Sequence, residues 1–159
     1  MTPAIVAVER ARVAHRVLSY PHDPSAPAYG PEAASALGLD PRQVFKTLVV
    51  SLEGAPRGGA LAVAVVPVSQ QLDLKAAAEA LGAKRAAMAD VAAAERATGY
   101  VVGGISPLGQ KKALRTVVDA SALDLPELFV SAGRRGLELA LAPDDLLRLT
   151  GGITAPIAR

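Results

Sequence analysis

The segment Val44-Phe45-Lys46-Thr47-Leu48-Val49-Val50-Ser51-Leu52 predicts a buried β-strand at the centre of the fold. Val, Leu and Phe dominate it, and β-branched side chains suit the pleated surface of a sheet. Lys46 is the one cation in this apolar run. A lysine in such a place is stable where its aliphatic stem lies on apolar surface and its ammonium reaches water or a partner. The segment therefore predicts either a functional cation at the mouth of a core or an ordinary edge lysine that extends to solvent.

The residues around this strand predict a mixed α/β fold of the α+β type. Residues 60–68 predict a second buried strand, and the Gly- and Pro-containing loop 53–59 makes a hairpin of the pair. Because strands and short helices follow one another irregularly, we expect a mixed sheet and not a doubly wound parallel sheet. Further strands are expected at 15–20, 84–88, 114–119, 128–131 and 137–141, and residues 100–105 are expected to lead from a strand into a Gly-rich turn. Helices or helical turns are expected at 2–13, 31–38, 40–43, 73–82, 90–98, 121–125 and 143–149, with Thr2, Asp73 and Asp90 as N-caps and a glycine after the helix at 90–98. Residues 133–136 predict a turn.

Composition limits the class of protein. A chain of 159 residues suits one domain, spanning 1–159, with one sizeable core. The 17 Lys and Arg exceed the 15 Asp and Glu by two, so charge alone does not predict nucleic-acid binding. The sequence has no cysteine, which excludes disulfides and a cysteine nucleophile, and its two histidines make a structural zinc site unexpected. The longest apolar run, 60–68, is too short to cross a bilayer, so we expect a cytoplasmic protein without a membrane partner.

The segment Gly103-Gly104-Ile105-Ser106-Pro107-Leu108-Gly109 is the second unusual stretch. Its two glycines allow a positive φ or a close backbone approach, and Pro107 stiffens the exit. A rigid turn with free N–H groups can bind a carbonyl or phosphate oxygen, although a tight turn between strands is the simpler interpretation. The spacing matches neither a nucleotide-binding P-loop nor a dinucleotide fingerprint, and Ser106 lacks the elbow motif of serine hydrolases.

Single polar residues elsewhere carry weaker signals. Tyr20, at a strand end, is typical of a packing residue, whereas Tyr29, in a proline-rich loop, is a better candidate for contact with a flat ligand. Ser131 could contribute a hydroxyl to a ligand or terminate a strand. Glu138 alternates with apolar residues, so we expect it to face solvent. The pair Arg134-Arg135 is either solvated or a phosphate contact.

Five segments, taken in order, resemble the bacterial YbaK/EbsC family, which is related to the editing domain of prolyl-tRNA synthetase. The resemblance covers nearly the whole chain and implies the fold of that family, a partly barrel-like mixed β-sheet surrounded by short helices. The segments are Tyr20-Pro21-His22-Asp23-Pro24, Val44-Phe45-Lys46-Thr47-Leu48, Pro67-Val68-Ser69-Gln70-Gln71-Leu72-Asp73-Leu74-Lys75, Thr98-Gly99-Tyr100-Val101-Val102-Gly103-Gly104-Ile105-Ser106-Pro107-Leu108-Gly109-Gln110-Lys111-Lys112 and Val130-Ser131-Ala132-Gly133.

The resemblance implies a reaction. Prolyl-tRNA synthetase mischarges tRNA(Pro) with cysteine, because a small pocket separates cysteine from proline, which is close in size, by only a few kcal/mol of binding free energy. Proteins of this family remove the cysteine from the mischarged Cys-tRNA(Pro). The thiol of the substrate is thought to attack its own ester carbonyl, which leaves positioning and electrostatics to the protein. The implied partners are the 3′ end of aminoacylated tRNA(Pro) and prolyl-tRNA synthetase, and no cofactor or metal is implied. Two alternatives are a non-catalytic module that binds the tRNA end and a deacylase for another small aminoacyl-tRNA such as Ala-tRNA(Pro).

The resemblance also implies the site residues. Lys46 matches the key lysine of the family, where it would hold an oxygen of the terminal adenosine or offset developing negative charge. The chain has Glu138 where close relatives carry Asp, which moves the carboxylate by about one methylene. The positions implied to bind the substrate are Tyr20, Tyr29, Thr47, Gly103, Gly104, Ser106, Pro107, Ser131 and Glu138.

Overall fold

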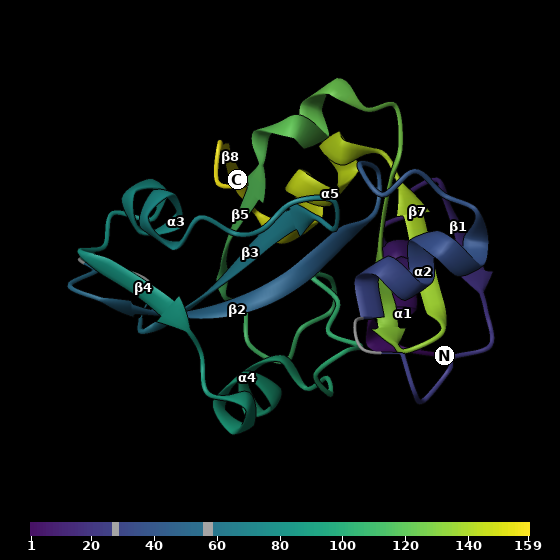
Figure 1. Ribbon diagram of the computed structural model, residues 1–159, viewed down its shortest axis with the longest axis horizontal. Helices are drawn as coiled ribbons and strands as arrows, with labels where there is room; N and C mark the ends of the chain where they lie inside the picture. The colour runs from purple at the N-terminus through teal and green to yellow at the C-terminus, as the bar shows by residue number, and fades with distance from the viewer. Residues whose placement is uncertain (27–28, 56–58) are drawn as a thin grey trace.

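The computed structural model describes residues 1–26, 29–55 and 59–159, and the fold has two β-sheets surrounded by short helices (Figure 1). Pro27, Ala28 and residues 56–58, which belong to two of the predicted loops, lie outside the described residues. The helices are α1 (Pro3–Arg10), α2 (Tyr29–Leu37), α3 (Leu74–Ala80), α4 (Val91–Thr98), the 3₁₀-helix η1 (Ala120–Asp124) and α5 (Pro143–Thr150). The strands are β1 (His15–Ser19), β2 (Phe45–Glu53), β3 (Leu61–Pro67), β4 (Arg85–Met88), β5 (Arg115–Asp119), β6 (Leu128–Arg134), β7 (Leu137–Leu141) and β8 (Ile153–Ala155).

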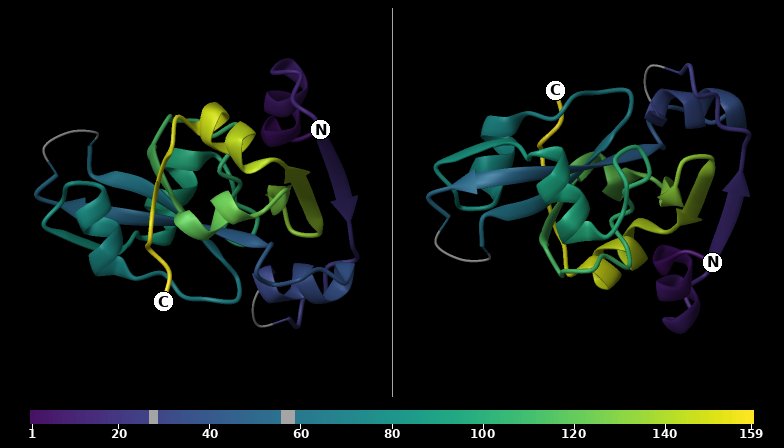
Figure 2. Two further views of the ribbon diagram at one scale, coloured as in Figure 1. Left: turned by 90° about the horizontal axis from the view of Figure 1, so that it is seen from above. Right: turned by 90° about the horizontal axis from the view of Figure 1, so that it is seen from below.

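The larger sheet has the order β4-β2-β3-β5-β8 and is mixed, as predicted. β2 pairs antiparallel with β3 and β4, whereas β3–β5 and β5–β8 are parallel pairs. The smaller sheet, β1-β7-β6, is antiparallel. A parallel bridge between Val44 and Phe129 joins the start of β2 to β6, so the sheets meet at one corner without closing into a barrel. Figure 2 shows the smaller sheet at one end of the molecule and α3 with β4 at the other.

The strand β2 has one apolar cluster on each face, because its side chains alternate in direction. Phe45 and Val49 belong to the largest core cluster, together with residues of β6 and β7 such as Leu139. Val50, on the opposite face, belongs to a second cluster that includes Leu81 after α3. The same alternation places Lys46 and Thr47 on opposite faces of β2, at the end nearest the smaller sheet.

The helix caps follow the sequence closely. The Thr2 hydroxyl accepts the Ile5 N–H at 3.3 Å, Asp73 accepts the Ala76 N–H at 3.0 Å, and Asp90 accepts the Ala93 N–H at 3.2 Å. Each such cap satisfies an N–H group that the first helical turn leaves free. The left-handed Gly99 ends α4 as predicted.

The structure corrects several predicted bounds. In residues 100–105 the predicted strand is wrong and the predicted turn is correct, because a carboxylate oxygen of Glu95 accepts the Val102 N–H at 2.8 Å and the Tyr100 hydroxyl donates to the Leu108 carbonyl at 2.6 Å. These bonds hold the segment as a loop, in which Gly103 has a φ of 94°. The strand β8 was not predicted, since three residues are too short for a periodic signal.

Smaller differences concern element ends. α1 ends at Arg10 and not near residue 13, and α2 begins two residues before Pro31. Residues 41–43 form the predicted single turn, in which the carboxylate of Asp40 accepts the Arg42 N–H at 2.9 Å. β6 runs on to Arg134 through a register shift, so the predicted turn at 133–136 is shorter. Among the described residues, no helix is long and apolar enough to span a bilayer.

Candidate functional site

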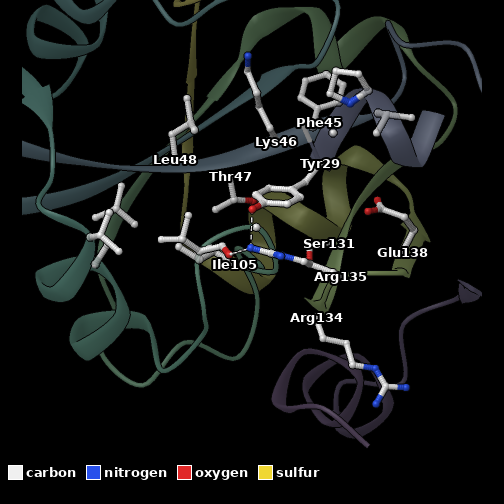
Figure 3. Close-up of a pocket in the computed structure, with 18 of the residues that line it drawn as sticks. Tyr29, Phe45, Lys46, Thr47, Leu48, Ile105, Ser131, Arg134, Arg135 and Glu138 are labelled. Carbon is white, nitrogen blue, oxygen red and sulfur yellow. Dashed lines mark hydrogen bonds between the residues drawn. The ribbon is translucent and has the colours of Figure 1, made fainter. Parts of the chain in front are cut away.

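A cavity of about 460 Å³ lies where the first half of β2 faces the loop after α4 and the turn between β6 and β7 (Figure 3). Its volume suits a small ligand or the end of a larger one. Apolar side chains make most of its wall, including Phe45, Val49 and Ile105. The polar and charged side chains that line it are Tyr20, Tyr29, Lys46, Thr47, Ser131, Arg134, Arg135 and Glu138.

Seven of the ten residues implied by the family resemblance line this cavity, although they come from widely separated segments: Tyr20, Tyr29, Lys46, Thr47, Gly103, Ser131 and Glu138. Gly104, Ser106 and Pro107 are buried behind the wall and do not line it. The Ser106 hydroxyl accepts the Leu108 N–H at 3.2 Å, and its carbonyl accepts the Gln110 amide at 2.9 Å. Gly104 and Ser106 therefore shape the loop from behind the wall.

Glu138 is buried, so the prediction that it faces solvent is wrong. It lies in the central strand of the smaller sheet, paired with Leu18 on one side and Ser131 on the other, and is 7% exposed. Cross-strand neighbours share a face of a sheet, so Ser131 and Glu138 present their side chains together. The alternation correctly indicates that Glu138 points to the face of β7 opposite the leucines. That face is covered and forms the floor of the cavity.

Burial leaves the Glu138 carboxyl poorly solvated. Its Oε2 has no hydrogen-bond partner among the described residues, and desolvation raises the pKa of Glu138 to about 8. Burial, followed by the charge of Glu138, also raises the pKa of the Tyr20 hydroxyl. Thr47 Oγ1 is a second buried atom without a hydrogen-bond partner in the part of the chain that the structure describes. Unpaired buried polar atoms are costly, so these two atoms weaken the fold at the wall of the cavity.

Lys46 and Thr47 extend from opposite faces of β2. In Figure 3, Thr47 lies beside Tyr29 and Ile105, whereas the Lys46 side chain extends away from Ser131 and Glu138. Partial burial lowers the pKa of the Lys46 ammonium, and none of the described residues forms an ion pair or hydrogen bond with it. The cation thus stands at the margin of the cavity with all its donors available.

Arg135, which the predicted site did not include, holds Tyr29 in place. Its guanidinium carbon lies 3.9 Å from the centroid of the Tyr29 ring, and its Nη2 donates to the Tyr29 hydroxyl and, at 3.2 Å, to the Val102 carbonyl. A Cβ on Gly103 would come within 2.6 Å of both the ring and the Arg135 Nε, so only glycine fits between them. The signal in the sequence was the pair Arg134-Arg135, which gave no indication of its aromatic partner.

The loop before α2 is fixed by hydrogen bonds to Glu32. His22 Nδ1 lies 2.7 Å from Glu32 Oε1, and Glu32 Oε2 accepts the Asp23 N–H at 2.8 Å. The hydrogen bond from His22 lowers the pKa of Glu32. The His22 ring is 6.1 Å from that of Tyr29, so this pair supports the aromatic wall from outside. Nowhere in residues 1–26, 29–55 and 59–159 do three His, Cys, Asp or Glu side chains gather in a way that could hold a metal ion.

Comparison with known proteins relates this chain to tRNA editing. Residues 24–149 match the model of the aminoacyl-tRNA editing domain. The chain belongs to this family. A curated protein of Enterococcus faecalis, EbsC, named as a candidate Cys-tRNA(Pro)/Cys-tRNA(Cys) deacylase, is 42% identical over 125 residues, which cover 78% of this chain and 73% of that protein.

Solved structures agree with the family. A crystal structure described as a candidate trans-editing enzyme for prolyl tRNA synthetase superposes with a TM-score of 0.81 at 25% identity, covering 100% of this chain and 99% of that one. A crystal structure of a hypothetical protein gives a TM-score of 0.83 at 24% identity, covering 99% of this chain and 100% of that one, and shows the fold alone. The mixed fold expected from the resemblance is therefore confirmed.

Proposed function

We propose that this protein is a trans-editing deacylase that cleaves the aminoacyl ester of Cys-tRNA(Pro). The observation that carries the proposal is the cavity of an editing-domain protein that gathers Tyr20, Tyr29, Lys46, Thr47, Gly103, Ser131 and Glu138 around one space. Support also comes from the 42% identity to a protein named for this activity. In this assignment the aminoacyl end and the terminal adenosine enter the cavity, and the rest of the tRNA stays outside.

The chemistry begins with the thiol of the substrate. The sulfur attacks the ester carbonyl carbon, the bond from that carbon to the ribose oxygen breaks, and the ribose oxygen takes the thiol proton. The products are tRNA with a free terminal hydroxyl and a cysteine thiolactone, which water then opens to cysteine. No nucleophile from the protein is needed, which agrees with a sequence that has no cysteine. The protein accelerates the step by positioning and electrostatics.

Each polar group then has a role. Glu138 and Ser131 lie side by side on the floor, where the carboxyl of Glu138 can bind the α-ammonium of the substrate and become ionised as it does so. Tyr20 and Tyr29 confine the aminoacyl group and the adenosine. The Lys46 ammonium, which extends from the outer face of β2, is suited to a ribose or phosphate oxygen of the terminal nucleotide.

The implied partner is prolyl-tRNA synthetase. A net charge of +2 provides little attraction for a whole tRNA, so delivery by the enzyme that makes the error would raise the local concentration of the substrate. This activity belongs to the cytoplasm, where tRNA is charged. Pull-down of prolyl-tRNA synthetase, with and without tRNA(Pro), tests the association.

The direct test is ester loss from purified Cys-tRNA(Pro), Ala-tRNA(Pro) and Pro-tRNA(Pro) mixed with the protein. We expect rapid loss of cysteine and little loss of proline. Ser-tRNA(Pro), which replaces the thiol by a hydroxyl, should be cleaved much more slowly, and equal cleavage would show that the thiol is not the nucleophile. If the protein binds tRNA but cleaves none of these esters, it is a non-catalytic module that binds the tRNA end and not a deacylase.

A further inference from the structure

A groove of about 510 Å³ lies beside the cavity and shares Val102, Arg134 and Arg135 with it. Its other lining residues are Pro3, Gly99, Tyr100, Val101, Gly104 and Gly133. Because Arg135 is bonded to Tyr29 and Val102, it stands as a fixed partition between the two spaces. A chain whose end occupies the cavity could continue past this partition into the groove.

The groove is positively charged. Arg134 and Arg135 line it, no Asp or Glu does, and the Lys111 Cβ would lie 3.4 Å from a Cβ built on Gly99, so Lys111 flanks it. The carboxylate of Glu95 is nearby, but it accepts the Val102 N–H at 2.8 Å. The C-terminal carbonyls of α4 at Ala97 and Thr98 accept the N–H groups of Lys112 and Lys111, which limits their negative potential.

Two arginines from adjacent positions serve the two spaces differently. Arg135 Nη2 donates to Tyr29 and Val102, whereas its Nη1 forms no hydrogen bond with the described residues. Arg134 is exposed, forms no ion pair or hydrogen bond with the described residues, and extends away from the cavity in Figure 3. A phosphodiester chain has one anion per nucleotide, which matches cations placed in series better than a single small anion does.

The rigidity of the groove supports this assignment. A Cβ on Gly104 would lie 2.7 Å from Arg134 Cα, and one on Gly133 would lie 2.9 Å from the Tyr100 ring. The loop and β6 are therefore in direct backbone contact beneath the groove. Val101, on the rim, is 68% exposed and provides an apolar surface against which a base can rest. A preformed surface of this kind lowers the entropy cost of ordering a flexible single strand.

We propose that this groove binds the nucleotides that precede the terminal adenosine, with Arg134 and Lys111 contacting their phosphates and Arg135 marking the passage into the cavity. The inference rests on the proposed deacylase function and adds the path of the single-stranded 3′ end. It assigns to Arg134 a role in recognising the nucleic acid and no role in the chemistry.

The test compares two substrates, Cys-tRNA(Pro) and 3′-O-cysteinyl-adenosine, which has no phosphate. Arg134→Ala should lower kcat/KM for the tRNA by about threefold to tenfold and lower the ratio of the two kcat/KM values. Its slope of log kcat/KM against log salt should be shallower by about 0.7, the value for one phosphate contact to a single strand. Val101→Asp, which removes the apolar surface at the rim and adds a negative charge, should raise KM for the tRNA.

The matched control is Arg85→Ala, because Arg85 is exposed and lines neither cavity nor groove. Arg85→Ala should leave kcat/KM for both substrates unchanged. An Arg134→Ala variant with the wild-type ratio and salt slope would overturn the proposal, as would equal losses on both substrates. If the wild-type protein cleaves neither substrate, the deacylase assignment fails. In that case, fluorescence anisotropy of a labelled CCA-ended RNA tests whether the groove binds RNA. Weaker binding by Arg134→Ala would support the groove, and unchanged binding would overturn it.

Discussion

The guanidinium carbon of Arg135 lies over the ring of Tyr29, 3.9 Å from its centroid, and Arg135 donates a hydrogen bond to the hydroxyl of the same residue. Tyr29 begins α2, whereas Arg135 follows β6, so the contact joins two elements 106 positions apart in sequence. A planar guanidinium can stack and donate at the same time, which an ammonium cannot. The pair fixes one wall of the cavity and its passage to the neighbouring groove.

Loss of this contact should impair catalysis more than stability. Arg135→Ala should lower kcat/KM for Cys-tRNA(Pro) by about tenfold to a hundredfold, because a misplaced Tyr29 no longer confines the ester. Arg135→Lys keeps the charge without the planar fork and should recover only part of the rate. Tyr29→Phe is the control that keeps the ring and removes the hydroxyl. A full recovery by lysine would show that charge alone is required.

Replacement of Lys46 should impair catalysis without lowering stability. Lys46→Met should reduce deacylation by at least about a hundredfold, the usual loss when one preorganised electrostatic group is removed. Its stability should be equal to or slightly above that of the wild type, because burial disfavours the ammonium and lowers its pKa. Single-turnover rates and urea denaturation measure the two effects. Wild-type rates in Lys46→Met would contradict the proposed role of the cation.

The sequence predicted those parts of the fold that local chemistry determines. The strand at 44–52, its hairpin with 60–68 and the caps at Thr2, Asp73 and Asp90 are confirmed, because alternation and capping are properties of neighbouring residues. Glu138 was misplaced because alternation gives the face of a strand and not what covers that face. Arg135 was missed for a similar reason, since its partner Tyr29 becomes a neighbour only after folding.

The glycine-rich loop at 103–109 likewise makes contacts with distant residues that the sequence does not predict. The pair Gly103-Gly104 predicted a close approach, and the structure places Tyr29 and Arg135 against the first and the backbone of Arg134 against the second. What the sequence could not give was the identity of these neighbours, which come from the start of α2 and from the end of β6 with the turn after it. Ser106 and Pro107 belong to the same motif and still lie outside the cavity, because a tight loop turns consecutive residues in different directions.

Gly104 should be essential for stability. A Cβ there would lie 2.7 Å from Arg134 Cα and 3.0 Å from its carbonyl carbon, and backbone atoms cannot move aside easily. Gly104→Ala should therefore cost about 1–3 kcal/mol, as overpacking usually does. The comparison is Gly38→Ala, at a φ of 65° with no atom within 4 Å, which isolates the cost of a left-handed backbone at about 1–2 kcal/mol. Thermal or urea denaturation measures both, and a neutral Gly104→Ala would show that the loop can shift.

The length of the Glu138 side chain should influence which amino acid is removed. Glu138→Asp withdraws the carboxylate by about one methylene and opens the floor beside Ser131. We expect the ratio of rates on Cys-tRNA(Pro) and Ala-tRNA(Pro) to change by several-fold, since small changes in a pocket are worth about 1–3 kcal/mol. Deacylation of both substrates by the two proteins under one condition measures the ratio. Identical ratios would remove Glu138 from the specificity site.

Glu138 should also make stability depend on pH. Its folded pKa is about 8, above the ordinary value of 4.5, so between these values the folded state keeps a proton that the unfolded state has lost. The free energy of unfolding should therefore fall as the pH rises through this window, with a contribution from Glu138 of up to about 1.4 kcal/mol per pH unit. Glu138→Gln removes the titrating carboxyl, so the free energy of unfolding of this variant should depend less on pH than that of the wild type. Urea denaturation at pH 5, 6, 7 and 8 gives both curves, and their difference isolates Glu138 from other titrating groups; parallel curves would mean that the buried carboxyl ionises without penalty.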